Sequence, residues 1–424
     1  MPYSSADRAT VEQYRSVDEL LNRRDVKRAE ILIARYLRSE LSVQERAGLL
    51  IARARARLLT ARADDALDDL NHARTLLPDD FDNPATLELL GDAHFARFEL
   101  ASVGFADRND TAQALAAYER IPAEFPQYGN RGWIFYQRGR IFLTENRVDD
   151  AVECFQQALL MPSTVPALTA YCYERLGFVA FYERRNFEQA ISFLNKAVAT
   201  YPAAEDRLWL VHVHTLRSRV HREMRDIDAA VEAARSAISV AGSADGKAGL
   251  TDALLAAAET LAPLDGREKE VIAYLQQYVQ MSKKPLGIDV TWSRIHEMLG
   301  DAYYKANQLQ NAVSAYQAAL QVNPYTPWEL SLDYRIARTL YQLGEYEQAI
   351  RAIQKMMQSA EADGQAVGDY RVYHILGNSH FALGSYRHAA DAYQTALDIA
   401  PANADGLDKV RQYLQFAQDL SRPV

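Results

Sequence analysis

The sequence predicts an all-α solenoid, built from consecutive antiparallel helix pairs instead of around one central core. Three observations support this fold class: one short pattern recurs along the chain, apolar residues around each copy are three and four residues apart, and the period-two alternation typical of strands is absent. A chain of 424 residues would otherwise suggest two or three domains, but a repeat array grows through contacts between neighbours.

The pattern is clearest in two segments of equal length. Residues 299–324 read "LGDAYYKANQLQNAVSAYQAALQVNP", and residues 376–401 read "LGNSHFALGSYRHAADAYQTALDIAP". Both begin with Leu-Gly, contain Ala-x-x-x-Tyr-x-x-Ala and end with proline. The small residues allow two helices to approach closely, the tyrosines fill the space beside them, and proline ends the second helix because it cannot continue it.

A small or branched apolar residue in the middle of each second helix serves as an anchor for counting the units. These anchors are Ala29, Ala66, Ala114, Ala151, Ala190, Ala230, Val271, Ala312, Ala349 and Ala389. They predict one continuous solenoid over residues 1–424, with units at about 10–43, 44–80, 84–126, 131–163, 169–203, 209–243, 246–284, 292–325, 329–362 and 369–402. A further helical segment, residues 405–420, has no partner helix and is expected to cap the end.

These residues together resemble the tetratricopeptide repeat (TPR). The resemblance implies a right-handed superhelix, with the first helix of each pair lining a concave groove that binds proteins or peptides. Most intervals between anchors are 37 to 41 residues, which exceeds the usual period of about 34.

The unit at 84–126 carries an insertion. Gly91 and Ala114 are 23 residues apart, whereas Gly300 and Ala312 are 12 apart. The extra residues fall within 97–110 and are interpreted as an elongated turn. The alternative is a feature specific to one partner, because insertions in solenoids collect where binding surfaces form.

Composition excludes several functions. The net charge of −9 argues against nucleic-acid binding. No apolar run approaches the roughly 18 residues that span a membrane, and no signal peptide begins the chain, so a cytoplasmic location without membrane insertion is expected. The two cysteines, Cys154 and Cys172, have no zinc-site spacing, and no nucleophile or acid pair stands out. We therefore expect no metal, no cofactor and no enzymatic activity.

An acidic run lies at residues 62–84 and includes Asp64, Asp65, Asp68, Asp69 and Asp82. It lacks the residue order of a calcium-binding loop. The run is interpreted as a solvated helix face with carboxylates near helix ends. The alternative is a docking patch for a basic partner.

The groove implied by the resemblance alternates arginine with aromatic residues along one stripe of the first helices. The predicted binding residues are Trp133, Tyr136, Arg140, Tyr171, Phe178, Arg219, Arg222, Arg294, Tyr334, Arg338 and Arg371. Arginine and aromatic side chains are common interface anchors, and this surface suits a protein or peptide segment with acidic and aromatic residues. A competing interpretation is that the tyrosines pack between repeats.

The function predicted from these features is that of a non-enzymatic protein-binding scaffold or adaptor, as a single protein or as a subunit of a larger assembly. The alternative is a peptide-sensing regulator whose superhelix changes shape when the ligand binds. Self-association into a homo-oligomer is left open. In the unit near residue 300, Glu297 and Asp301 occupy groove positions and are expected to repel a carboxylate ligand.

Overall fold

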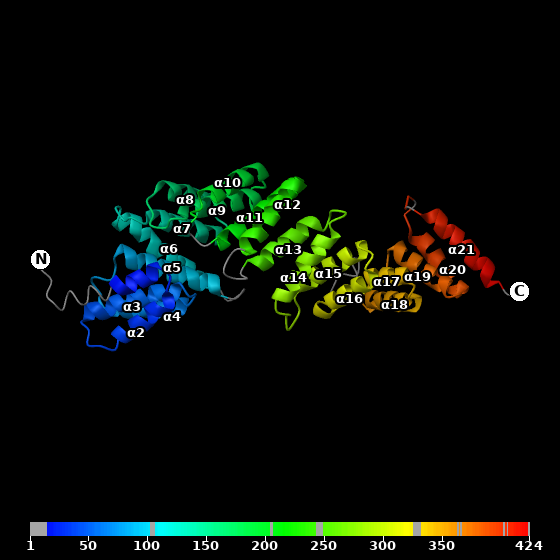
Figure 1. The fold of residues 1–424 in the computed structure, drawn as a ribbon, viewed down its shortest axis with the longest axis horizontal. Helices are drawn as coiled ribbons and strands as arrows, with labels where there is room; N and C mark the ends of the chain where they lie inside the picture. The colour runs from blue at the N-terminus through cyan, green and yellow to red at the C-terminus, as the bar shows by residue number, and fades with distance from the viewer. Residues whose placement is uncertain are drawn as a thin grey trace. The chain divides into compact units, whose positions relative to one another are not determined.

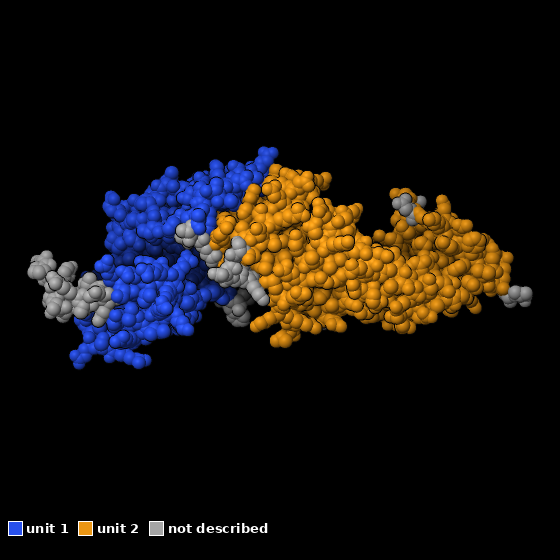
Figure 2. Space-filling view, viewed as in Figure 1, with its two compact units in different colours: residues 1–205 blue, residues 206–424 orange. Residues whose placement is uncertain are grey.

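The computed structural model describes residues 15–101, 107–203, 207–242, 249–324, 332–362, 364, 367–401, 403–404 and 406–422. Within these ranges every regular element is a helix, and no strand occurs. The chain divides into two compact units, Met1–Glu205 and Asp206–Val424, which Figure 2 shows in different colours. The single continuous solenoid over residues 1–424 stays a prediction.

The first unit consists of helices packed in consecutive pairs (Figure 1). Residues 15–22 are helical, and the following helices are α2 (Val26–Tyr36), α3 (Val43–Leu58), α4 (Ala63–Leu76), α5 (Pro84–Leu100), α6 (Arg108–Glu124), α7 (Arg131–Thr144), α8 (Val148–Leu160), α9 (Leu168–Tyr182) and α10 (Phe187–Thr200). Part of the predicted 10–43 unit lies outside the described residues.

The second unit continues the same construction. Its helices are α11 (Leu208–Glu223), α12 (Ile227–Gly242), α13 (Leu250–Leu261), α14 (Glu268–Met281), α15 (Val290–Lys305), α16 (Leu309–Val322), α17 (Leu332–Leu343), α18 (Tyr346–Ala362), α19 (Tyr370–Ala382), α20 (Tyr386–Ile399) and α21 (Leu407–Ser421). Helix α21 packs against α20, in the place of the predicted capping helix. The first residues of the predicted 329–362 unit lie outside the described ranges.

The anchors lie inside the helix pairs, as the fold class requires. Every one of them is at most 1% exposed. A side chain as small as alanine lets the two helices of a pair approach, and the larger residues one turn away then complete the core. The helix positions and this burial confirm the all-α helical-repeat fold in each unit.

Glycines in the first helices provide space for a tyrosine from the second helix. A Cβ atom on Gly300 would lie 2.3 Å from Cε1 of Tyr316, and one on Gly377 would lie 2.6 Å from Cδ1 of Tyr393. Both rings are at most 1% exposed. The glycine is needed for this contact and not for a special backbone angle.

The residue after such a glycine accepts a hydrogen bond from the tyrosine hydroxyl. The three pairs are Tyr118 to Asp92 (2.5 Å), Tyr316 to Asp301 (2.7 Å) and Tyr393 to Asn378 (2.8 Å). Where the second helix has Phe155, which donates no such bond, Arg140 follows the glycine. The repeat therefore uses these acceptors for its own packing, which removes them from a list of free binding groups.

The insertion at 97–110 lengthens two helices. Helix α5 ends nine residues after Gly91, and α6 begins six residues before Ala114; the corresponding distances in α15 and α16 are five and three residues. The interpretation as an elongated turn is therefore incomplete. Residues 102–106 of the connection lie outside the described ranges.

A buried carboxylate joins the two lengthened ends. Asp110 is 3% exposed, its Oδ2 accepts a bond of 2.9 Å from Nε of Arg97, and its Oδ1 lies 3.0 Å from Nδ1 of His94. Burial opposes the charge, but the bonds from Arg97 and His94 outweigh it and lower the pKa of Asp110. The end of α5 and the start of α6 are thus joined by a buried ion pair.

The acidic run at 62–84 is only partly a solvated face. Asp69 is 3% exposed and forms ion pairs of 2.6 Å with both Arg53 and Arg57 of α3. Asp82 pairs with Arg120 at 2.8 Å. The solvated-face interpretation is wrong for Asp69, because helix α4 turns this side chain toward α3.

Two carboxylates of α5, Glu88 and Asp92, each accept hydrogen bonds from neighbouring helices and turns. Glu88 accepts bonds of 2.9 Å from Tyr128 and from Asn130, and Asp92 accepts one of 3.0 Å from Gln137. Burial, with a smaller contribution from Asp92, raises the pKa of Glu88 to about 7. Burial also raises the pKa of Asp92. Glu88 therefore ionises inside the folded unit only near neutral pH.

The Glu88→Gln variant should gain stability relative to the wild type as the pH rises. The unfolded chain ionises Glu88 near its ordinary pKa of 4.5, and the folded chain near 7, so the stability from the protonated side chain is lost as pH rises across this window. We expect the melting temperature of the variant to exceed that of the wild type by about 3 °C at pH 8 and by much less at pH 5.

Differential scanning fluorimetry across this pH range measures the difference. Glu153→Gln, at an exposed position on α8, is the matched control and should show no such trend. A difference between Glu88→Gln and wild type that stays constant with pH would contradict the raised pKa of Glu88.

Candidate functional site

The eleven predicted binding residues all lie on first helices of the pairs, namely α7, α9, α11, α15, α17 and α19. Their surroundings differ between the units. Some pack into the core, some form ion pairs within the chain, and three line a pocket in the second unit.

The aromatic residues of the first unit stack on one another. The rings of Trp133 and Tyr136 lie 5.3 Å apart, and those of Tyr136 and Tyr171 lie 6.0 Å apart. Tyr136 is 8% exposed, and burial raises the pKa of its hydroxyl. This packing matches the competing interpretation of the sequence for Tyr136, whereas Trp133 and Tyr171 are half-buried.

Arg140 and Phe178 also have partners within the first unit. The guanidinium of Arg140 lies 4.8 Å from the centre of the Phe95 ring, donates a bond of 2.8 Å to Gln137 and forms an ion pair with Glu99. The guanidinium carbon of Arg175 lies 5.1 Å from the centre of the Phe178 ring. A ligand that binds Arg140 would have to compete with Glu99.

In the second unit, two predicted arginines converge on one acceptor. Arg222 of α11 and Arg294 of α15 lie 3.7 and 3.2 Å from the carboxylate of Glu259 on α13. The Glu259 side chain is 12% exposed. Arg219 lies one turn before Arg222 and is half-buried. The carboxylate of Glu259 on α13 thus links stripe residues on α11 and α15, so three consecutive first helices are connected by ion pairs.

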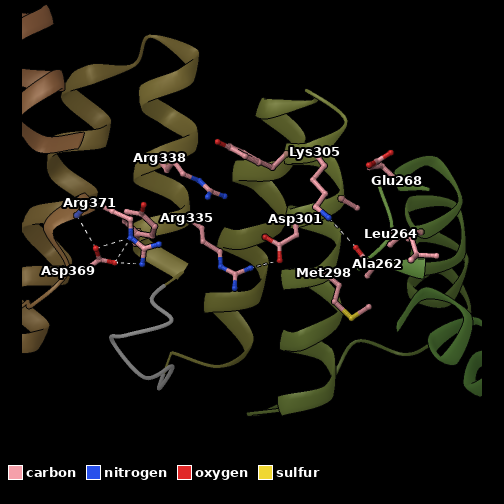
Figure 3. A pocket seen from close by; sticks show the side chains of 14 residues that line it. Ala262, Leu264, Glu268, Met298, Asp301, Lys305, Arg335, Arg338, Asp369 and Arg371 are labelled. Carbon is pink, nitrogen blue, oxygen red and sulfur yellow. Dashed lines mark hydrogen bonds and ion pairs between the residues drawn. The ribbon is translucent and has the colours of Figure 1, made fainter. Parts of the chain in front are cut away.

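The remaining predicted residues, Tyr334, Arg338 and Arg371, line a pocket of about 490 Å³ (Figure 3). This volume is within the usual range of about 300–1,000 Å³ for ligand pockets. The structure adds lining residues that were not among the predicted binding residues: Ala262, Leu264, Glu268, Val271, Met298, Asp301, Ala302, Tyr304, Lys305, Arg335 and Asp369. They come from the turn after α13, from α14, α15 and α17, and from the N-cap of α19.

Arg335 pairs with both acidic residues of α15. It forms an ion pair of 2.8 Å with Glu297 and a second one with Asp301, which also accepts the hydroxyl of Tyr316. Its single positive charge offsets only one of the two carboxylates, so the expectation that Glu297 and Asp301 repel a carboxylate in the groove stays a prediction. Arg335 directly follows Tyr334 and is not part of the predicted stripe. Its role could have been inferred from Glu297 and Asp301, the two acids on the preceding first helix, α15.

Two other cations of the pocket are paired as well. Arg371 binds Asp369, the residue that caps α19, at 2.6 Å. Lys305 donates to the carbonyl oxygen of Ala262 at 3.3 Å and lies 3.6 Å from the carboxylate of Asp265.

Arg338 differs from these cations. Its guanidinium carbon lies 4.1 Å from the centre of the Tyr304 ring, and its buried Nε has no hydrogen-bond partner. Among the residues that the structure describes, Arg338 forms no ion pair. In Figure 3 its side chain extends from α17 toward α15. The pocket therefore presents one cation that the described chain does not neutralise.

Other site types find no support in the described part of the chain. It contains no group of three or more histidine, cysteine or acidic side chains placed to hold a metal ion. Both cysteines are buried, and burial raises the pKa of both thiols. Among the described helices, none has the length and apolar content needed to cross a membrane.

Stacked helix pairs with buried small anchors define a helical-repeat protein. The sequence profile of the tetratricopeptide repeat matches residues 136–205, 297–366 and 370–403. Over these residues the chain contains tetratricopeptide repeats. Repeats of this kind make it, in general terms, a protein-interaction scaffold, and neither profile match is to an enzyme family.

Similar proteins agree with the fold. The chain is 28% identical over 104 residues to small glutamine-rich tetratricopeptide repeat-containing protein 2 of Mycosarcoma maydis. The matched segment covers 24% of this chain and 27% of that protein. The chain thus spans about a quarter of the length of that relative.

Two solved structures are also similar. The apo form of the quorum sensor NprR from B. thuringiensis has a TM-score of 0.56 at 12% identity, covering 74% of this chain and 87% of that one. The C-terminal part of a TPR repeat-containing protein from Cytophaga hutchinsonii has a TM-score of 0.45 at 15% identity, covering 68% of this chain and 100% of that one. The likeness to NprR is one of fold.

Proposed function

We propose that this protein is a non-enzymatic scaffold that binds a partner protein along the stripe-bearing face of its first helices. The pocket of α15, α17 and α19 is the main contact in this proposal. The observation that carries it is Arg338, which has no acidic partner among the described residues and is stacked on an aromatic ring within a pocket. Arginine and aromatic residues in desolvated pockets supply much of the affinity of protein interfaces.

The first unit contributes less in this proposal. Arg140 already pairs with Glu99, and Tyr136 is buried among other rings. Binding there would require an internal ion pair to break, and the free energy of the new contact would be offset by that loss. We therefore place the main recognition of an acidic and aromatic partner segment in the second unit.

Affinity purification from the source cells, with quantitative mass spectrometry, tests this function. We expect Arg338→Glu to reduce the co-purified partner at least tenfold, because it reverses the charge at the pocket. Arg351→Glu is the matched control: it makes the same change at an exposed position on α18, the second helix of the same pair. The control should retain the partner.

Equal recovery with both variants would contradict the proposal. The double variant Arg140→Glu/Arg219→Glu tests the rest of the stripe and should reduce recovery less than Arg338→Glu. If it alone removes the partner, the contact lies on another part of the first helices. Light scattering of the purified chain checks self-association, which stays a prediction.

The peptide-sensing alternative stays a prediction as well. It differs from the scaffold in requiring a change of shape upon binding. A fall in the radius of gyration when a peptide that binds the chain is added, measured by small-angle scattering, would favour the sensor. An unchanged radius with bound peptide would favour the scaffold.

A further inference from the structure

The pocket of the second unit has two chemically different walls. Leu264, Val271 and Met298 line one side, from the turn after α13, from α14 and from α15. Arg338 and Arg371 line the other side, from α17 and α19 (Figure 3). A ligand that fills both sides must carry an apolar group and an anionic group.

The charge available to a ligand is concentrated at Arg338. The other arginines of the pocket have carboxylate partners within hydrogen-bond distance, whereas Arg338 forms no ion pair with any residue that the structure describes. A guanidinium binds a carboxylate through two parallel hydrogen bonds, and because the Nε of Arg338 is buried, a ligand would meet the terminal nitrogens of this side chain. The guanidinium carbon of Arg338 lies 4.1 Å from the centre of the Tyr304 ring, so the two form a cation–π contact. This contact supplies no acceptor oxygen to the N–H groups of the guanidinium.

The opposite end of the pocket disfavours a second acid. Glu268, at the start of α14, lines the pocket beside Leu264 and Val271. Lys305 also lines the pocket there, but it already lies 3.6 Å from Asp265 and donates to the carbonyl oxygen of Ala262. An apolar side chain at this end would cover the exposed part of Met298, whereas a carboxylate would meet Glu268 and a lysine that is already paired. The α17 side is therefore the favoured position for the acid of a ligand.

We infer that this pocket binds an extended segment of the partner protein, with one Glu or Asp side chain on Arg338 and an apolar side chain against Leu264, Val271 and Met298. The inference rests on the proposed function and adds the chemistry of the partner at this site. Three successive first helices packed roughly 10 Å apart give a span of about 20 Å. An extended chain covers that span with about six residues, at roughly 3.3 Å per residue.

Selection of random twelve-residue peptides displayed on phage, with the full purified chain as target, tests this inference. We expect enriched peptides to share one acidic and one apolar residue at a fixed spacing, without an acid at the apolar position. Fluorescence anisotropy then measures the affinity of one enriched peptide. We expect Arg338→Gln to weaken it at least tenfold, and Arg351→Gln to leave it unchanged.

A double-mutant cycle identifies the contact. Replacing the acidic residue of the peptide by its amide should weaken binding to the wild type as much as Arg338→Gln does, and should weaken binding to Arg338→Gln no further. Leu264→Ser should weaken binding of the same peptide independently of the acid. Thermal melting of each variant verifies that it is folded.

The outcomes separate this inference from the proposed function. Enriched peptides without an acid, or an enriched peptide that binds Arg338→Gln as well as the wild type, would overturn the inference. The inference would also be overturned if the selection yields no peptide although Arg338→Glu loses the cellular partner. In that case the proposed function would stand. Peptides that need Arg338, with a cellular partner that does not, would overturn the proposed function and, with it, the assignment of the bound segment to the partner.

Discussion

Gly300→Ala is expected to destabilise the second unit by about 3 kcal/mol, the upper part of the range for overpacked cores. The new Cβ would lie 2.3 Å from Cε1 of Tyr316, a ring that is fully buried and whose hydroxyl is bound to Asp301. The ring cannot move away without losing this bond. Alanine favours the helix by roughly 1 kcal/mol over glycine, which offsets only part of the clash.

Urea unfolding followed by circular dichroism measures this effect. Gly368→Ala in the same unit is the control, because a Cβ there would have no atom within 4 Å. In a Tyr316→Leu background the penalty of Gly300→Ala should shrink, since the ring that causes the clash is gone. An equal penalty in both backgrounds would show that the clash is not its cause.

Asp69→Ala is expected to destabilise the first unit by about 3 kcal/mol, near the cost of leaving buried charges without their partner. The carboxylate accepts hydrogen bonds from Arg53 and forms an ion pair with Arg57, and the side chains of these arginines are only 28% and 19% exposed. Without Asp69, the two arginines would repel each other in a region with little water. The loss should therefore exceed that of any surface carboxylate in the same run.

Hydrogen exchange in α3 and α4, together with urea unfolding, measures the loss. Asp68→Ala, the exposed neighbour on the same helix, should change stability by less than about 0.5 kcal/mol. Asp69→Asn keeps the shape and removes the charge, so its effect should be intermediate. Equal effects of Asp68→Ala and Asp69→Ala would restore the interpretation of the run as a solvated face.

The contacts within each helix pair could be predicted because they are local in the sequence. Gly300 and Ala312 are 12 residues apart, and the turn between α15 and α16 leaves little choice in how they meet. The same spacing in several units made the pattern visible, and the buried anchors confirm it. The helical extension of α5 and α6 could not be predicted from spacing alone, because an insertion may lengthen a turn or a helix.

The candidate site depended on contacts between neighbouring helix pairs of the second unit. A helical stripe identified Tyr334, Arg338 and Arg371, but it could not show that Arg335 pairs with both Glu297 and Asp301. Nor could it show that Arg338 has no acidic partner among the described residues. These facts depend on side chains more than 30 residues apart, on helices whose relative rotation the repeat pattern leaves open.

The sequence by itself determined the helix pairs, their order and the small residues at which they touch, because close packing within a pair restricts residue size at fixed short intervals. Only the tertiary structure decided which of the charges on the described residues are paired with one another. Electrostatic pairing depends on distances of a few ångströms between long side chains, and many sequences satisfy the same helical repeat with different pairings.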